Sequence, residues 1–219
     1  MPVPQKHIYL SGLCDTLARR WPDNRTVNLV CHGHSVPSGY ACTPMVDTFH
    51  AYPHLMHWTL KQRFPYAVIN VIVTAIGGEN SVQGAARFEE DVLCHKPDLV
   101  TVDYGLNDRG LTPAQAEQAW RKMIEAALAR GIPMILLTPS WDQTWFEQSG
   151  EWQALEQHAR QIRRLAGEYG TGLADSFAAY EREVGEHGNL LNLLSHWNHP
   201  SAAGHELIAA ELTAWFPAR

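Results

Sequence analysis

Five short apolar segments recur along the chain, and each is followed by a turn or a loop signal. They are rich in Val, Ile and Leu and carry few polar side chains. The segments span residues 27–31, 68–73, 99–102, 133–137 and 171–174, the last being the weakest. Apolar runs of this length are typical of strands that are buried on both faces of a sheet.

Longer segments with apolar residues at helical spacing lie between these strands. The helices that this spacing predicts span residues 5–21, 53–64, 81–93, 113–130 and 151–167, and a last one begins after Ser201. Thr112-Pro113-Ala114-Gln115 has the form of a capping box with proline at the first helical position. Asn80 or Ser81 is the expected cap of the helix over 81–93.

Strands that alternate with helices of this length predict an α/β fold with a parallel sheet covered on both faces. Right-handed crossovers then give a three-layer α/β/α sandwich of the flavodoxin-like kind, with about five strands in the order 2-1-3-4-5. No repeat or linker divides the 219 residues, so we expect a single domain over 1–219.

Composition excludes several classes of partner. Lys and Arg number 17 against 23 Asp and Glu, so the net charge is −6, and no basic stripe indicates a nucleic-acid partner. No apolar stretch is long enough to span a bilayer, and the first residues lack a signal-peptide pattern. We expect a soluble, cytoplasmic protein with no membrane partner, no cofactor and reduced cysteines. The oligomeric state is not indicated.

Chemistry-bearing residues follow the first three strands. Ser35 stands on a turn directly after the first strand, Gly77-Gly78 follows the second, and Asn107-Asp108 follows the third. In the order 2-1-3 these three loops meet at one edge of the sheet, where α/β proteins bind ligands. His199 lies just before the last helix, on a loop that can fold over the same edge.

Together these residues are suited to acyl transfer. A serine hydroxyl needs a base to take its proton, and histidine is the usual one. The backbone N–H groups of Ser35 and Gly78 and the side-chain amide of Asn107 are potential donors to an oxyanion. Taken singly, each residue also has an ordinary role, as a helix cap, a turn or a surface side chain.

The four segments, in this order, resemble the SGNH (GDSL-like) hydrolases over residues 27–210, nearly the whole chain. The resemblance implies a serine esterase that works through an acyl-enzyme. It implies Ser35 as the nucleophile, His199 as the general base, and Ser35, Gly78 and Asn107 as the oxyanion hole.

Two positions depart from the family pattern. The family usually has aspartate before the serine, where this chain has His34, and aspartate three residues before the catalytic histidine, where this chain has His196. The third triad member is therefore open. The partner of His199 is then a backbone carbonyl near His196 or Trp197, or an acid from elsewhere in the fold. A third alternative is that the chain is an inactive relative that binds a carbohydrate or acyl ligand.

A metallohydrolase is a further alternative, since histidines cluster in two of these segments. They are His32, His34, His196, His199 and His205. No carboxylate or cysteine completes an evident ligand pattern, so we expect no metal.

Candidate substrate contacts surround the expected site. Trp141 and Trp145 follow the fourth strand, Trp197 stands two residues from His199, and Arg109 follows Asn107-Asp108. We also include His34 among the possible substrate-binding residues. The expected substrate is a small acyl ester, such as an O-acetyl group on a carbohydrate.

Overall fold

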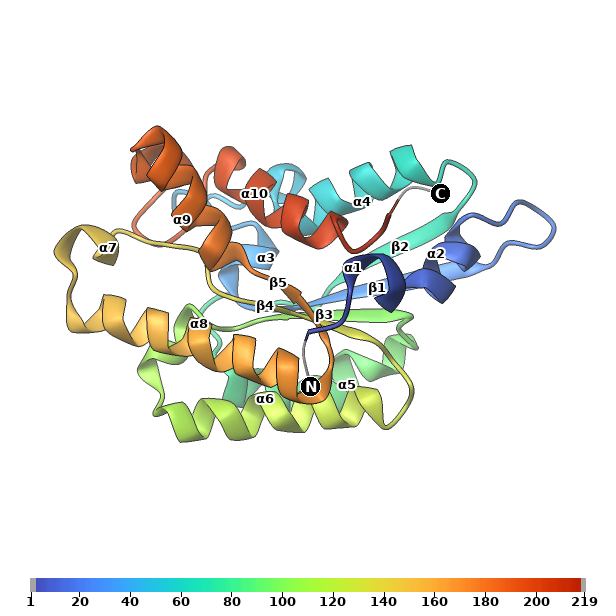
Figure 1. Cartoon of the computed structure of the whole chain (residues 1–219), viewed down its shortest axis with the longest axis horizontal. Coiled ribbons are helices and arrows are strands. Elements are labelled where there is room, and N and C mark those ends of the chain that lie inside the picture. Colours follow the sequence, from blue (N-terminus) through green and yellow to red (C-terminus); the bar gives the residue numbers. More distant parts are fainter. Residues whose placement is uncertain (1–2, 218–219) are drawn as a thin grey trace.

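The computed structural model describes residues 3–217, and at their centre lies a sheet of five strands (Figure 1). The strands are β1 (Thr26–Gly33), β2 (Val68–Val73), β3 (Leu99–Asp103), β4 (Met134–Leu137) and β5 (Gly172–Ala174). They lie in the order β2-β1-β3-β4-β5, and every neighbouring pair is parallel. The predicted fold class and strand order are therefore confirmed.

Helices cover both faces of the sheet (Figure 1). One layer holds α4 (Tyr52–Arg63), α9 (Ser176–His187) and α10 (Ala202–Thr213), and the other holds α5 (Ser81–Asp91), α6 (Pro113–Leu128) and α8 (Gly150–Tyr169). A hydrophobic core fills the space on each side. Trp215 and Tyr180 are fully buried in one core, and Trp120 and Phe88 lie in the other.

Shorter helical elements form the connections. They are α1 (Lys6–Tyr9), α2 (Ser11–Leu17), α3 (Ser35–Ser38), α7 (Thr144–Glu147), η1 (Thr48–His50), η2 (Leu93–His95), η3 (Asn107–Gly110) and η4 (Leu190–Leu193). Among the helices of residues 3–217, none is long and apolar enough to cross a bilayer.

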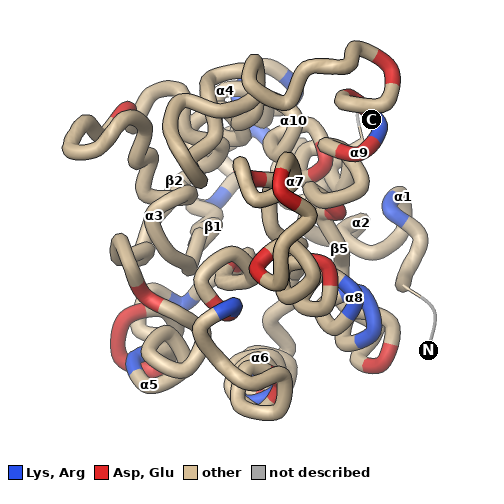
Figure 2. Tube along the Cα trace, turned by 90° about the vertical axis from the view of Figure 1, so that its left-hand side faces the viewer, with Lys and Arg blue, Asp and Glu red and all other residues tan. Residues whose placement is uncertain are grey.

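The register brings the ends of three strands together. Gly33 at the end of β1 pairs with Asp103 at the end of β3, and Cys31 pairs with Val73 at the end of β2. Because the strands are parallel, the loops that follow them leave from the same edge. Figure 2 looks onto this edge, where Lys and Arg of the described chain are interspersed with Asp and Glu and form no single basic tract.

Two helices differ from the sequence prediction. The segment 5–21 forms α1 and α2, because the backbone leaves helical geometry at Leu10 (φ −103°, ψ 20°), whose side chain is buried in the core. Tertiary packing overrides the helical spacing there. Helix α9 was not predicted, although Phe177, Tyr180 and Val184 give it an apolar stripe and Asp175 caps it by accepting the Ala178 N–H.

The predicted helix caps are confirmed. Thr112 and Gln115 form a reciprocal capping box at α6, and Asn80 and Gln83 form another at α5. Ser201 caps α10 by accepting the N–H of Gly204. These caps define where α5 and α10 begin, and both helices start next to loops at the carboxyl edge of the sheet.

We expect Thr112→Ala to lower the free energy of unfolding by about 1 kcal/mol, because the Gln115 N–H loses its side-chain acceptor. Urea unfolding followed by circular dichroism measures this change. Gln118→Ala, at an exposed position on the same helix, is the matched control and should change stability by less. Equal effects of the two substitutions would contradict the assigned capping role.

Candidate active site

Ser35 is the first residue of α3 and follows β1 after a single residue. The preceding residue, His34, caps this helix with its ring, because its Nδ1 accepts the N–H of Val36 at 3.1 Å. Ser35 is 7% exposed, so its hydroxyl lies just beneath the surface at the carboxyl edge of the sheet. This is the strand–turn–helix setting that the sequence predicts for it.

His199 reaches Ser35 from the other end of the chain. Its Nε2 lies 3.0 Å from Ser35 Oγ, and its Nδ1 lies 2.9 Å from the carbonyl oxygen of Ala41. A carbonyl only accepts, so Nδ1 carries the ring hydrogen and donates it to Ala41. The Nε2 lone pair then faces the Ser35 hydroxyl. This is the tautomer that a general base needs.

Local bonds shape the loop that carries His199. An antiparallel bridge joins Leu194 to Pro200, and the His199 carbonyl accepts the N–H of Ser195 at 3.0 Å. The Ser195 hydroxyl donates to the carbonyl of Pro200 at 2.8 Å. His199 therefore stands on a tight turn that directly precedes α10.

The surroundings of His199 lower its pKa below the usual value of 6.5. Burial is the main cause, because it disfavours the charged ring. Donation to the Ala41 carbonyl opposes this effect, and the nearby His196 adds to it. The ring is therefore neutral at pH 7, as a general base must be.

The Ala41 carbonyl is itself held in place by a small loop. The Ala41 N–H donates to Met45 at 3.0 Å, Tyr40 and Val46 form an antiparallel bridge, and the Asp47 N–H donates to Gly39 at 2.7 Å. The hypothesis of a carbonyl near His196 or Trp197 is wrong in its location. The acceptor lies 158 residues away in sequence, where only the tertiary fold brings it to His199.

The second loop forms a tight turn over Ile76-Gly77-Gly78-Glu79, closed by the Glu79 N–H on the Ile76 carbonyl at 3.3 Å. Gly78 has φ +83°, a left-handed conformation that side chains other than glycine adopt only with strain. Within residues 3–217, the N–H groups of Ser35 and Gly78 have no acceptor. Both remain available to a ligand.

The third loop is bonded to the second. Asn107 Nδ2 donates to the Glu79 carbonyl at 2.8 Å, which leaves the second hydrogen of this amide free to donate elsewhere. Asp108 is fully buried, accepting the Ser81 N–H at 2.8 Å and the indole N–H of Trp120 at 2.7 Å. These bonds hold the start of α5 and the Gly78 turn against the Asn107 loop.

Tyr40 is a site residue that the sequence analysis missed. Its ring centroid lies 6.0 Å from that of His199, at an angle of 40°. The same ring would lie 3.0 Å from a Cβ on Gly77, so it packs directly against the glycine turn. Tyr40 thus forms a wall between the histidine and the Gly78 turn. The sequence signal that could have identified Tyr40 is its position five residues after Ser35.

Three candidate substrate contacts need correction because the structure buries or pairs them. Trp141 is only 5% exposed and packs among other aromatic rings of the core. Arg109 forms an ion pair with the fully buried Asp142, with Nη1 2.8 Å from the carboxylate. His34 is fully buried, with Nε2 3.6 Å from Asp103, and burial lowers its pKa to about 3.

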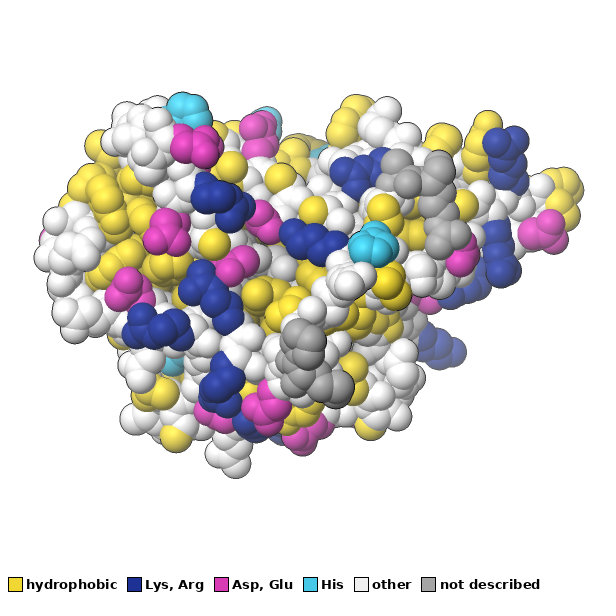
Figure 3. Space-filling model, in the orientation of Figure 1, with side chains coloured by type: hydrophobic (Ala, Val, Ile, Leu, Met, Phe, Trp, Pro, Cys, Tyr) yellow, Lys and Arg dark blue, Asp and Glu magenta, His cyan; other side chains and the backbone are white. Residues whose placement is uncertain are grey.

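The other aromatic candidates lie nearer the surface. Trp197 is 46% exposed, and Trp145 is half-buried against Trp141. Hydrophobic side chains gather over α7 in Figure 3, where Phe146 is also exposed. His196 is exposed and forms no hydrogen bond or ion pair with another residue of the described chain.

The histidines proposed as alternative metal ligands serve separate purposes. His199 bonds Ser35, His34 caps α3, and His32 contacts Thr74 and Gly84. Within residues 3–217, no group of three or more His, Cys, Asp or Glu side chains is arranged to hold a metal ion.

Several known proteins and one protein family are similar to this chain. The model of the GDSL-like lipase/acylhydrolase family matches residues 31–207. An acetylxylan esterase of Geobacillus stearothermophilus is 28% identical over 166 residues, covering 68% of this chain and 73% of that protein. Esterase TesA of Pseudomonas aeruginosa is 34% identical over 95 residues, 42% of this chain and 46% of that esterase.

Solved structures share the fold. The acetylxylan esterase Axe2 of Geobacillus stearothermophilus superposes with a TM-score of 0.72 at 22% identity, covering 88% of this chain and 97% of that one. LAE5, an alpha/beta hydrolase enzyme from the metagenome of Lake Arreo, Spain, gives 0.71 at 24% identity, covering 87% and 94%. Because the family model matches residues 31–207, the chain belongs to the GDSL-like lipase/acylhydrolase (SGNH) family, whose members are esterases and acylhydrolases.

Proposed function

We propose that this esterase works through an acyl-enzyme formed on Ser35, with His199 as the general base. The observation that carries the proposal is the 3.0 Å contact between Ser35 Oγ and His199 Nε2 at the carboxyl edge of the sheet. A hydroxyl within hydrogen-bond distance of a neutral, correctly oriented imidazole is the arrangement from which a serine attacks an ester.

The first half-reaction transfers the acyl group to the enzyme. Ser35 Oγ attacks the ester carbonyl carbon while its proton moves to His199 Nε2. The negative charge that forms on the carbonyl oxygen is stabilised by the Ser35 and Gly78 N–H groups and by the free hydrogen of the Asn107 amide. The intermediate then collapses, and the alcohol leaves with the proton held by His199.

The second half-reaction releases the acid. A water molecule gives a proton to His199 as it attacks the acyl carbon, and the same donors stabilise the second oxyanion. Collapse of this intermediate breaks the bond to Ser35 Oγ, which recovers the proton from His199. The carboxylic acid and the starting enzyme result.

The acceptor behind His199 sets a limit on the rate. The Ala41 carbonyl holds the tautomer, but it is neutral and stabilises the imidazolium less than a carboxylate would. Replacing the triad aspartate by asparagine in a serine protease lowers kcat by about 10⁴, mainly because the tautomer is then wrong. Since the tautomer is right here, only the charge stabilisation is lost. We infer slow turnover of unactivated esters.

We propose a small acyl ester as the substrate, with an O-acetyl group on a carbohydrate as the leading candidate. The acetylxylan esterase that is 28% identical over 68% of the chain supports this class. The half-exposed Trp197, two residues from His199, supplies an indole on which a sugar face can stack. Tyr40 provides a second aromatic surface beside the histidine.

Ser35→Ala is expected to abolish hydrolysis of p-nitrophenyl acetate without unfolding the protein, because Ser35 begins the short helix α3 and lies just beneath the surface. A fluorophosphonate should label the wild type at Ser35 alone, as read by peptide mass spectrometry. Ser149→Ala, at a serine of another loop, is the control and should leave both readouts unchanged. Full activity in Ser35→Ala would overturn the proposed nucleophile, and an inactive wild type would favour a ligand-binding relative.

Asn107→Ala should lower kcat by about 10²–10³ with little change in KM, because the amide acts mainly on charge that develops in the transition state. Asn107→Asp should lower it further, since a carboxylate repels the oxyanion. Steady-state kinetics on p-nitrophenyl acetate measures both. Asn24→Ala removes an amide that likewise donates to a carbonyl, and it should leave kcat unchanged. A raised KM with normal kcat in Asn107→Ala would contradict the assigned role.

The pH profile should report His199. Protonated His199 cannot act as a base, so kcat/KM should rise with pH through a pKa below 6.5 and level off at neutral pH. His196→Asp replaces a group that lowers this pKa by one that raises it, so the acid limb should move to higher pH. His196→Asn is the uncharged control and should move it less. A shift to lower pH in His196→Asp would show that another group is titrating.

A further inference from the structure

The turn that carries Gly78 is closed by one hydrogen bond and is packed by the Tyr40 ring at Gly77, but no side chain of residues 3–217 packs against Gly78 itself. Gly77 and Gly78 are both exposed, and no heavy atom beyond the chain neighbours lies within 4 Å of where a Cβ of Gly78 would stand. Two consecutive glycines have more conformational freedom than any other pair of residues. The direction of the Gly78 N–H must therefore be set by the residues that flank the turn.

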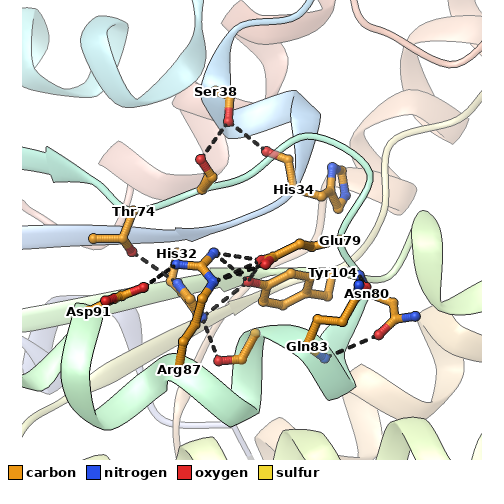
Figure 4. Close-up of polar contacts among 12 residues, drawn as sticks. His32, His34, Ser38, Thr74, Glu79, Asn80, Gln83, Arg87, Asp91 and Tyr104 are labelled. Carbon is orange, nitrogen blue, oxygen red and sulfur yellow. Dashed lines mark hydrogen bonds and ion pairs between the residues drawn. The ribbon is translucent and has the colours of Figure 1, made fainter.

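On one side of the turn, Glu79 sends its side chain into the protein (Figure 4). Arg87 of α5 binds its carboxylate in a fork, with Nε at 3.2 and 2.9 Å from the two oxygens and Nη2 at 2.7 Å from one of them. Only 14% of the Glu79 side chain and 16% of the Arg87 side chain are exposed. A forked ion pair that is largely shielded from water fixes both partners in one geometry.

Three further side chains extend this contact to the ends of the central strands (Figure 4). The Tyr104 hydroxyl, just after β3, lies 3.4 Å from Glu79 Oε2 and 3.1 Å from Nε2 of His32 in β1. His32 Nδ1 lies 2.9 Å from the hydroxyl of Thr74, just after β2. We call these five residues, His32, Thr74, Glu79, Arg87 and Tyr104, the Glu79 network.

The proton positions in the Glu79 network follow from its acceptors. His32 Nε2 lies 3.2 Å from the Gly84 carbonyl, which only accepts, so Nε2 carries the hydrogen and Nδ1 accepts from Thr74. Burial lowers the His32 pKa to about 4, and burial also raises the pKa of Tyr104. Both rings are neutral at pH 7, and the Tyr104 hydroxyl donates to the Glu79 carboxylate.

The fold makes room for this arrangement. A Cβ on Gly84 of α5 would lie 2.3 Å from the Tyr104 hydroxyl, so the phenol occupies the space that any other side chain at that position would need. The absence of a side chain at Gly84 thus lets Tyr104 reach both His32 and Glu79.

We propose that the Glu79 network positions two of the three oxyanion donors, the Gly78 N–H and the Asn107 amide, with Glu79 and Arg87 as positioning residues for catalysis. Glu79 connects to both donors through its own main chain. It directly follows Gly78, and its carbonyl accepts from Asn107 Nδ2 at 2.8 Å. Anchoring its side chain to α5 and β3 therefore holds the Gly78 N–H and the Asn107 amide in one geometry. This inference rests on the proposed function and adds to it the residues that keep the hole assembled.

The test compares Glu79→Gln with Asp91→Asn. Each variant removes one carboxylate charge that pairs with Arg87. Asp91 is 48% exposed and lies 3.2 Å from Arg87 Nη1, at the end of α5 that is farther from the Gly78 turn. The first readout is the second-order rate constant for phosphonylation of Ser35 by a fluorophosphonate, which uses the oxyanion hole without requiring the natural substrate. The second is kcat and KM for p-nitrophenyl acetate.

In Glu79→Gln we expect both rates to fall about 10- to 100-fold with KM within about twofold, since displacing a catalytic donor by about 1 Å costs this much. Asp91→Asn should match the wild type. Tyr104→Phe should show a smaller fall in the same direction. The single variant Arg87→Met should also lower both rates. The double variant Glu79→Gln/Arg87→Met should lower them no further than the more damaging of these two single variants, because the two residues act through one contact.

A folded Glu79→Gln variant that keeps wild-type rates would overturn the inference, as would equal losses in Asp91→Asn. If thermal unfolding shows that Glu79→Gln is not folded, Tyr104→Phe becomes the test of the inference. Unchanged rates in Tyr104→Phe would then overturn it. Failure of the proposed function has a different signature. In that case the wild type itself is not labelled at Ser35, or Ser35→Ala keeps its activity, and this inference falls with it.

Discussion

The placement of β1 between β2 and β3 is the constraint on which the site depends. Because the three strands are parallel, they end at one edge, and the pairing continues into the loops. The N–H groups of Thr74 and Ile76 donate to Cys31 and Gly33 beyond the last residue of β2. The Gly78 turn therefore leaves beside the turn that carries Ser35. Gly33 opposite Asp103 places the Asn107 loop on the other side. With β1 at an edge of the sheet, it would have only one neighbouring strand, and the Gly78 and Asn107 loops could not flank Ser35 on both sides.

The proposed base, His199, is oriented by the main chain. In a Ser-His-Asp triad the carboxylate fixes the tautomer and stabilises the imidazolium, whereas a carbonyl performs only the first task fully. Here the carbonyl of Ala41 is held by the loop that follows α3, so Ser35 and the acceptor of His199 belong to one local unit. Burial of His199 keeps its ring neutral, and a neutral ring is ready to accept a proton.

The proposed oxyanion hole includes a glycine turn with few contacts of its own, and charged side chains pack behind this turn. Glycine at 78 leaves the backbone open to a ligand and allows the left-handed conformation of the turn, but it supplies no contact of its own. The charged groups that support it lie behind the turn, between β1, β3 and α5, and are mostly shielded from water. In such surroundings a forked ion pair is stronger and more directional than on the surface.

The sequence by itself determined the sheet and its order, because apolar runs alternate with amphipathic helices and parallel crossovers have one hand. It also singled out Ser35, Gly78, Asn107 and His199, since each stands at a strand end or before a helix. Only the tertiary structure decided the partner of His199, the wall formed by Tyr40 and the burial of Trp141. These depend on contacts between residues far apart in the chain, such as Ala41 with His199, and such contacts leave no local pattern. The local sequence around a loop tryptophan is the same whether its side chain packs inward or faces solvent. The burial of Trp141 became evident only from its packing against Trp152 and Phe177.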